Sequence, residues 1–173
     1  MIRIAGNVHP DGIGYKGTEP QLLFASKTMT STFKRDNIEF SYPETWDLND
    51  TFDEDPSSGE VSLETPEGGF WTLVVFPPDV DPLELLENAK QGLVSQYEDV
   101  EFQVSNRPPD EVYPSLGTDA FFYCLDFLVT ANLSVISTPA QTLVICCQAE
   151  NREFDEKRDV FAAITSSLLK NLA

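Results

Sequence analysis

The stretch IEFSYPETWD, residues 38–47, is the part of the sequence that most directly indicates the fold. Its apolar residues alternate with polar ones, as they do on one face of a short β-strand: Ile38, Phe40 and Tyr42. Pro43 then ends regular pairing, because proline lacks the N–H that a β-ladder needs. Trp46 follows, and two interpretations of it stay open: it closes the end of the sheet, or it contacts a partner.

Working outward from this strand, the sequence predicts a mixed order of strands and helices. Residues 60–65 (EVSLET) and 69–76 (GFWTLVVF) have strand patterns, and the PEGG between them favours a hairpin turn. Asp81 and Pro82 have the residue types of a helix N-cap and first helical position, so a helix begins there. A last helix is expected over residues 155–172, where apolar residues recur at helical spacing.

Three further strands are expected at residues 118–129, 132–137 and 141–149, and the short links between them imply an antiparallel meander. The first has apolar residues on both faces, and one face carries Phe121, Tyr123, Leu125 and Phe127. A sheet with one solvated face would alternate apolar with polar residues. We therefore expect that helices cover both faces, or that this face contacts another subunit or a ligand.

Trp71 lies next to Phe70 on a predicted strand, so the two rings point to opposite faces. One of them fits core packing. The other, together with Trp46 and the apolar face of residues 118–129, supplies side chains for an apolar groove or an interface. We therefore include both tryptophans among the candidate partner-binding residues.

The composition limits the choice of partner. The net charge is −18, and no Lys or Arg occurs between Asp36 and Ala89, which disfavours nucleic acid because its binding depends on cationic side chains. An acidic surface fits a basic protein segment, a divalent cation, or simple solubility. No apolar run is long enough for a membrane span, and the polar, glycine-rich N-terminus lacks the pattern of a secretory signal, so a cytoplasmic location is expected.

The acidic stretch of residues 47–60 is a weak candidate for a metal site. Asp47, Asp53 and Asp55 share the alternate spacing of the first calcium ligands of an EF-hand. Phe52 stands where that loop needs glycine, and Ser58 where it needs a bidentate glutamate, so a true EF-hand is rejected. An irregular Ca²⁺ or Mg²⁺ site and a merely solvated loop are the two alternatives.

The sequence contains few residues and motifs that are typical of catalytic sites. His9 is the single histidine in the sequence, and triad-type catalysis needs a histidine as the base. It lies in residues 1–30, which are rich in glycine, proline, threonine and serine. We expect this segment to be a flexible or loosely packed arm, and residues 31–173 to form one domain. The three cysteines, Cys124, Cys146 and Cys147, form no CxxC pair and are expected to be buried thiols. No nucleotide-binding motif or nucleophile elbow is present, so we expect neither an enzyme nor a bound cofactor.

Four segments in this order resemble the PsbP-like superfamily: SYPETWD, GGFWTLVVF, the helix DPLELLENAKQGLVSQY, and the terminal FDEKRDVFAAITSSLL. YPETW and VFAAITSSL are the most specific fragments, and the resemblance covers about residues 32–172. It implies an α+β fold, an α/β sandwich with an antiparallel sheet of about six strands and helices on its faces. The superfamily includes a photosystem II extrinsic protein, a Ran-binding import factor, bacterial lipoproteins and the Eag-type secretion chaperones.

The resemblance also implies a binding or assembly role rather than catalysis. Like the Eag-type chaperones, this chain is acidic and small, which favours a chaperone or adaptor that holds an apolar or basic protein segment, as a homodimer. A small-ligand or divalent-cation-binding protein, acting through residues 47–60, is the alternative. The candidate partner-binding residues are those named above: Trp46, Trp71, Phe121, Tyr123, Leu125 and Phe127.

Overall fold

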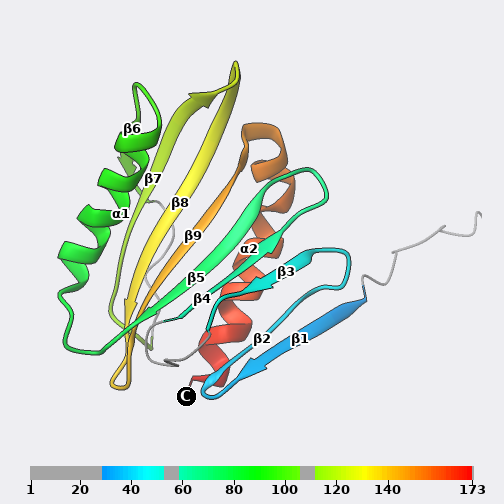
Figure 1. The fold of residues 1–173 in the computed structure, drawn as a ribbon, viewed down its shortest axis with the longest axis vertical. Coiled ribbons are helices and arrows are strands. Elements are labelled where there is room, and N and C mark those ends of the chain that lie inside the picture. The colour runs from blue at the N-terminus through cyan, green and yellow to red at the C-terminus, as the bar shows by residue number, and fades with distance from the viewer. Residues whose placement is uncertain (1–28, 53–58, 106–111, 173) are drawn as a thin grey trace, which may run out of the picture.

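The protein is built on one large antiparallel sheet, as seen in a computed structural model that describes residues 29–52, 59–105 and 112–172 (Figure 1). The seven-stranded sheet has the strand order β3-β4-β5-β9-β8-β7-β6, and β1 and β2 form a separate hairpin. The strands are β1 Thr30–Arg35, β2 Ile38–Pro43, β3 Asp47–Asp50, β4 Glu60–Glu64, β5 Phe70–Phe76, β6 Glu101–Val104, β7 Ser115–Cys124, β8 Phe127–Ser137 and β9 Thr142–Glu150. The helices are α1 Pro82–Gln96 and α2 Asn151–Asn171.

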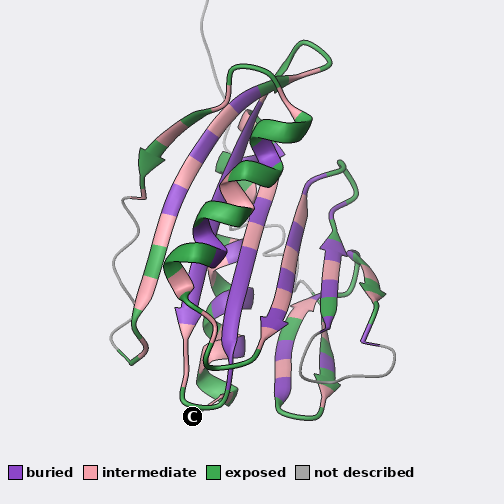
Figure 2. Cartoon of the chain, turned by 60° about the vertical axis from the view of Figure 1, so that its left-hand side comes forward, coloured by how far each residue is buried: buried purple, intermediate pink, exposed green. Residues whose placement is uncertain are grey.

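The two helices lie on opposite faces of the sheet. On one face, α1 buries Leu85, Leu86 and Leu93 against apolar residues of β7 and β8. Figure 2 shows how buried and exposed residues alternate along α1 as its inner side meets the sheet. On the other face, α2 and the β1–β2 hairpin cover β4, β5 and β9 in a second apolar cluster that contains Phe40 and Trp71. The predicted α+β fold, with an antiparallel sheet and helices on its faces, is therefore confirmed.

Several local predictions are also confirmed. The Asp81 carboxylate accepts a hydrogen bond from the Leu83 N–H at 2.9 Å, so Asp81 caps α1, and Pro82 begins the helix. The PEGG segment forms the β4–β5 turn, where Gly68 has a positive φ of 97°. Other boundaries differ: β3 forms in what we expected to be a loop, and α2 begins at Asn151 rather than at residue 155.

The prediction of one strand over residues 118–129 was wrong. The chain turns at Leu125 and Asp126, so that Cys124 pairs with Phe127 across the β7–β8 hairpin. Both turn residues have positive φ, 49° and 67°, as a type I′ link requires. Such turns normally contain glycine or asparagine, so the sequence carried no turn signal here. Because of the turn, Phe121, Tyr123, Leu125 and Phe127 do not share one face of one strand.

Both tryptophans lie in the core and not on a partner surface. The Trp46 side chain packs edge-on against Phe161 of α2, with ring centroids 5.5 Å apart, and Trp71 is fully buried beside Phe40. Of the two interpretations of Trp46, the structure therefore supports closure of the core. The prediction that Trp46 and Trp71 contact a partner directly was wrong, because both side chains are buried. A turn in which the Trp46 N–H donates to the Pro43 carbonyl at 3.0 Å brings the first indole onto α2, and the second donates to Thr165 of the same helix.

Two predictions fall largely outside the described residues. The N-terminal arm is one, since the description begins at residue 29. The metal site is the other, because Asp53 and Asp55 lie in the gap at residues 53–58, whereas Asp47 is an exposed residue at the start of β3. Within the described ranges, neither helix is long and apolar enough to cross a membrane.

Candidate functional site

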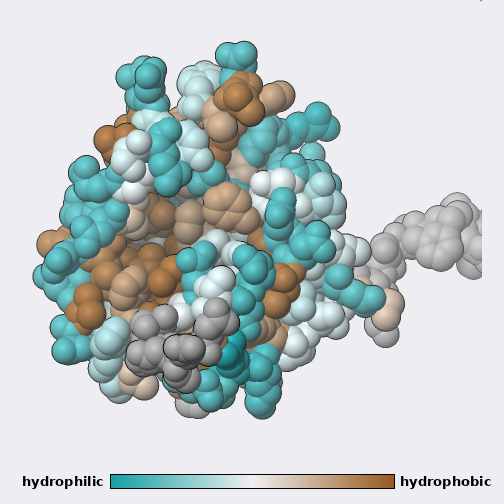
Figure 3. Space-filling view, in the orientation of Figure 1, coloured by the Kyte–Doolittle hydropathy of each residue, from teal (hydrophilic) through white to brown (hydrophobic). Residues whose placement is uncertain are grey.

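The end of the β7–β8 hairpin is a surface on which apolar side chains are exposed. Three large side chains are exposed there: Tyr123 at 67%, Leu125 at 87% and Phe127 at 63%. We call these three residues the hairpin tip. In Figure 3 apolar side chains stand out at the top of the molecule, where Figure 1 places the end of this hairpin, with hydrophilic side chains on both sides. A local group of exposed aromatic and aliphatic side chains is typical of a contact surface.

The hairpin turn places these residues at one end of the sheet, and since Cys124 pairs with Phe127 and Tyr123 with Leu128, the side chains of Tyr123 and Phe127 lie on opposite faces of the hairpin. Tyr123 is the last but one residue of β7, Leu125 is in the turn, and Phe127 begins β8. Phe121, the remaining candidate of this group, lies further down β7, opposite Thr130, and is only half exposed. The structure therefore gathers three of the six candidate residues at one place, and their role in partner binding stays a prediction.

Leu125 adopts a backbone conformation that leucine disfavours. Leu125 has a φ of 49°, and this left-handed backbone conformation costs a residue with a Cβ roughly 1–2 kcal/mol compared with a right-handed one. The exposed Leu125 side chain recovers little of this cost by packing, since it is 87% accessible. An exposed leucine at such a position favours a role outside folding.

Replacing Leu125 with glycine is therefore expected to raise the free energy of unfolding by about 0.5–1 kcal/mol, because glycine accepts a positive φ without strain. Urea denaturation followed by circular dichroism measures this. Leu116→Gly is the matched control: Leu116 is also exposed but lies in β7, where glycine is expected to destabilise by a similar amount. Equal destabilisation by both variants would contradict the strain at Leu125.

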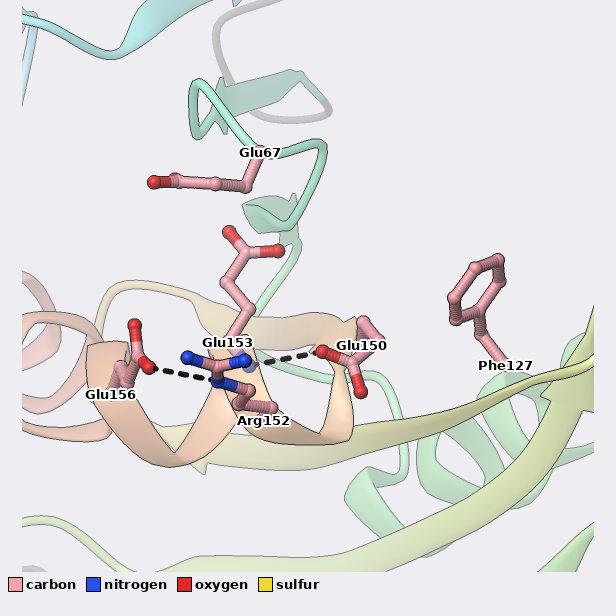
Figure 4. A pocket seen from close by; sticks show the side chains of 6 residues that line it. All are labelled: Glu67, Phe127, Glu150, Arg152, Glu153 and Glu156. Carbon is pink, nitrogen blue, oxygen red and sulfur yellow. Dashed lines mark hydrogen bonds and ion pairs between the residues drawn. The ribbon is translucent and has the colours of Figure 1, made fainter.

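A depression of about 430 Å³ adjoins the hairpin tip. It is lined by Glu67 of the β4–β5 turn, Phe127 of the hairpin tip, Glu150 at the end of β9, and three residues of the first turns of α2: Arg152, Glu153 and Glu156. We call it the acidic depression. Figure 4 shows Glu153 and Glu67 near each other, Arg152 beside Glu156, and Phe127 across from Glu150. The apolar tip and an acidic surface therefore share Phe127.

Two of the glutamates are fixed by contacts that also shape the fold. Glu153 is 8% exposed and accepts a hydrogen bond from the Thr65 hydroxyl, which in turn accepts one from the Gly69 N–H. A Cβ on Gly69 would lie 2.8 Å from the Glu153 Oε1 atom, so only glycine lets this carboxylate approach the turn. The Glu150 carboxylate accepts a bond from the Glu153 N–H at 3.3 Å and caps α2.

Two cations belong to the same region. The Arg152 guanidinium lies 3.3 Å from the Glu156 carboxylate, and the Lys157 ammonium lies 3.7 Å from the Glu67 carboxylate. The Arg152–Glu156 pair is largely exposed, so it contributes little to stability and can exchange partners, whereas the Lys157 side chain is only 26% exposed. The lining of the acidic depression itself keeps four carboxylates against one guanidinium.

Two features of the described residues bear on metal binding and on nucleophilic chemistry. No group of three or more His, Cys, Asp or Glu side chains in the described ranges is placed to hold a metal ion. Burial raises the pKa of the Cys146 thiol to about 12, so this cysteine is protonated at neutral pH and is a poor nucleophile. The side chains at the site itself present apolar surface and carboxylates.

The sequence alone did not reveal the acidic depression. Its residues come from the β4–β5 turn, the start of β8 and the β9–α2 junction, which are far apart along the chain. Each glutamate is one of 29 acidic residues, so none stands out by itself. The one local signal is PEGG, in which Gly69 leaves room for Glu153.

The fold defines a class: an antiparallel sheet with one helix on each face and an additional hairpin beside the C-terminal helix. No protein-family model and no curated protein matches the sequence. The solution structure of cyanobacterial PsbP (CyanoP) from Synechocystis sp. PCC 6803 matches with a TM-score of 0.57 and 13% identity, over 90% of this chain and 96% of that one. The chain therefore has the PsbP-like fold, as the sequence resemblance indicated.

Two other solved structures are similar at a lower level. A protein of unknown function from Pseudomonas aeruginosa, PA94, described as a putative regulator, has a TM-score of 0.47 and 6% identity, over 80% of this chain and 95% of that one. LpqN of Mycobacterium tuberculosis, involved in cell envelope biogenesis, has a TM-score of 0.44 and 12% identity, over 82% and 84% of the two chains.

Proposed function

We propose that this chain is a non-catalytic protein-binding module whose contact surface is the hairpin tip. The observation that carries the proposal is the exposure of Tyr123, Leu125 and Phe127 at one turn, where Leu125 adopts a strained conformation. Exposed aromatic side chains with few rotatable bonds lose little entropy on binding, which makes them effective contact residues. The form of binding that fits best is that of a chaperone or adaptor, which holds an apolar segment of another protein.

The rest of the molecule supports a rigid platform for such a contact. The tip extends from the two longest strands of the sheet, β7 and β8, which pair along their whole shared length. On the α1 side, Phe122 of β7 and Ala131 of β8 are almost fully buried in the apolar cluster that also contains the inner residues of α1. A preorganised hairpin of this kind lowers the cost of ordering a contact surface on binding.

Photo-crosslinking in the native cells tests the proposal. With p-benzoylphenylalanine in place of Leu125, we expect adducts to a small set of other proteins. The Tyr123→Asp/Phe127→Asp variant, probed from the same position, should lose them at least tenfold, because each large contact residue contributes about 2 kcal/mol at a binding hot spot. The same crosslinker in place of Leu83, which is 57% exposed on α1, is the matched control.

The outcomes separate clearly. Adducts that appear at position 125 but not at position 83, and that need the two aromatic rings, support the proposal. The same adducts from both positions, or an adduct only to a second copy of this chain, contradict it. Circular dichroism of the double variant checks that the fold is retained, as expected for two exposed side chains.

A further inference from the structure

We propose, building on the protein-binding function above, that the bound segment carries a lysine or arginine next to its apolar residues. Its cationic side chain enters the acidic depression while its apolar residues lie on the hairpin tip. The partner is thus an apolar, basic peptide segment and not an apolar segment of any kind.

The position of Phe127 links the two parts. Its ring is 63% exposed at the hairpin tip, and it also lines the acidic depression. Phe127 pairs with Cys124, so its ring lies on the face of the hairpin opposite to that of Tyr123. A segment that crosses the turn at Leu125 and packs on Phe127 therefore lies at the mouth of the acidic depression. The volume of about 430 Å³ is that of a site for a small-molecule ligand, so it has more than enough room for the end of one long cationic side chain.

The carboxylates of the acidic depression favour a cationic side chain. The lining contains four glutamates and one arginine, and Lys157 lies beside Glu67, so the carboxylates still outnumber the cations by four to two. The carboxylate of Glu153 is nearly buried, where water screens its charge less. Glu150 and Glu153 already interact with the start of α2 and with Thr65, but a carboxylate has room for further donors. The net charge of −18 adds a long-range field that attracts a basic segment.

Arg152 acts as an internal competitor in this arrangement. Its guanidinium is paired with Glu156 at 3.3 Å, and its side chain is 85% exposed, so an incoming cation can displace it at small cost. Removing the charge of Arg152 should therefore strengthen binding of the peptide. Removing a surface ion pair elsewhere on the molecule should leave binding unchanged. This expectation separates a cation-binding role of the acidic depression from a purely structural one.

The same surface argues against a membrane as the occupant. The exposed Tyr, Leu and Phe side chains of the hairpin are of the types that enter a lipid interface. Anionic lipid headgroups would be repelled by the glutamates of the acidic depression and by the net charge of the chain. A basic segment gains from the same charges.

A phage-displayed library of random dodecapeptides, selected on the full chain, tests the inference. We expect enriched peptides to contain Lys or Arg within about three residues of an aromatic or aliphatic residue. Three variants serve as baits for synthetic versions of these peptides: the tip variant Tyr123→Asp/Phe127→Asp, the neutralised variant Glu67→Gln/Glu150→Gln/Glu156→Gln, and Arg152→Gln. Glutamine keeps the acceptor with which Glu150 caps α2.

The neutralised variant is expected to bind these peptides about tenfold more weakly than the wild type does, and with a weaker salt dependence. Arg152→Gln is expected to bind them about threefold more tightly. A Lys→Met version of the peptides is expected to bind the neutralised variant and the wild type equally well. Peptides that need the hairpin tip but show no preference for Lys or Arg would overturn this inference and leave the protein-binding proposal intact. A library that yields no peptide dependent on the tip, with flotation on phosphatidylcholine vesicles that does depend on it, would overturn both.

Discussion

Replacing Trp71 with alanine is expected to lower the free energy of unfolding by about 3–5 kcal/mol, which is the usual cost of removing a fully buried indole. Trp71 has no accessible surface and packs against Phe40 with ring centroids 4.9 Å apart. Its Nε1–H donates to the Thr165 hydroxyl of α2 at 3.1 Å. One side chain therefore joins β5, the β1–β2 hairpin and α2, and its loss opens a cavity between all three.

Thermal and urea denaturation measure this effect, and a melting temperature lower by roughly 10 °C is expected for a chain of this size. Trp71→Phe separates packing from hydrogen bonding: it keeps an aromatic ring but leaves the Thr165 hydroxyl bonded only to the Phe161 carbonyl. We expect it to cost about 1–2 kcal/mol. Tyr123→Ala, at an exposed aromatic residue, should change stability by less than about 0.5 kcal/mol. Similar losses for Trp71→Ala and Tyr123→Ala would refute the core role of Trp71.

Gly59→Ala is expected to be the most damaging small substitution, at about 2–3 kcal/mol. A Cβ at this position would lie 1.8 Å from the Cδ1 atom of Phe52, whose ring is almost fully buried. The backbone cannot simply move away, because the Gly59 carbonyl accepts a hydrogen bond from the Val75 N–H of β5 at 2.9 Å. Phe52 would have to leave its place, where the guanidinium of Arg35 stacks 5.5 Å from its ring centroid.

A double-mutant cycle with Phe52→Leu tests this contact. The smaller side chain should destabilise the wild type but relieve part of the damage in Gly59→Ala, so the coupling energy has the sign of a removed clash. Gly92→Ala is the matched control: a Cβ there meets nothing within 4 Å, and in the middle of α1 it should stabilise by about 0.5–1 kcal/mol. Additive effects of Gly59→Ala and Phe52→Leu would show that the two residues do not touch.

The predictions from sequence failed at one turn more than anywhere else. Residues 118–129 appeared to be one strand because Leu125 and Asp126 lack the glycine or asparagine that a type I′ turn prefers. The structure breaks this stretch at those two residues. The candidate residues Tyr123, Leu125 and Phe127 nevertheless lie at one end of the sheet, because the two-residue turn joins the ends of β7 and β8 there.

The tryptophans show a different limit. Trp71 could be placed on a strand from its neighbours, but the alternation of the strand does not say which face of it α2 will cover. That choice depends on how α2, more than 70 residues later, packs across β5, β9 and β2. A local pattern therefore assigns a residue to a face, and only the packing of distant elements decides whether that face is the core.

The sequence by itself determined the fold class and most of the elements. The alternation of apolar and polar residues indicated most strands, Asp81 with Pro82 indicated the start of α1, and PEGG indicated a hairpin. The net charge disfavoured nucleic acid as a partner. Each of these inferences depends only on neighbouring residues or on composition. Only the tertiary structure decided that the tip of β7–β8 is exposed and that Glu67, Glu150, Glu153 and Glu156 surround one depression beside it. The physical reason is that a binding surface is made of side chains from separate segments, and their proximity is fixed by the packing of the whole sheet.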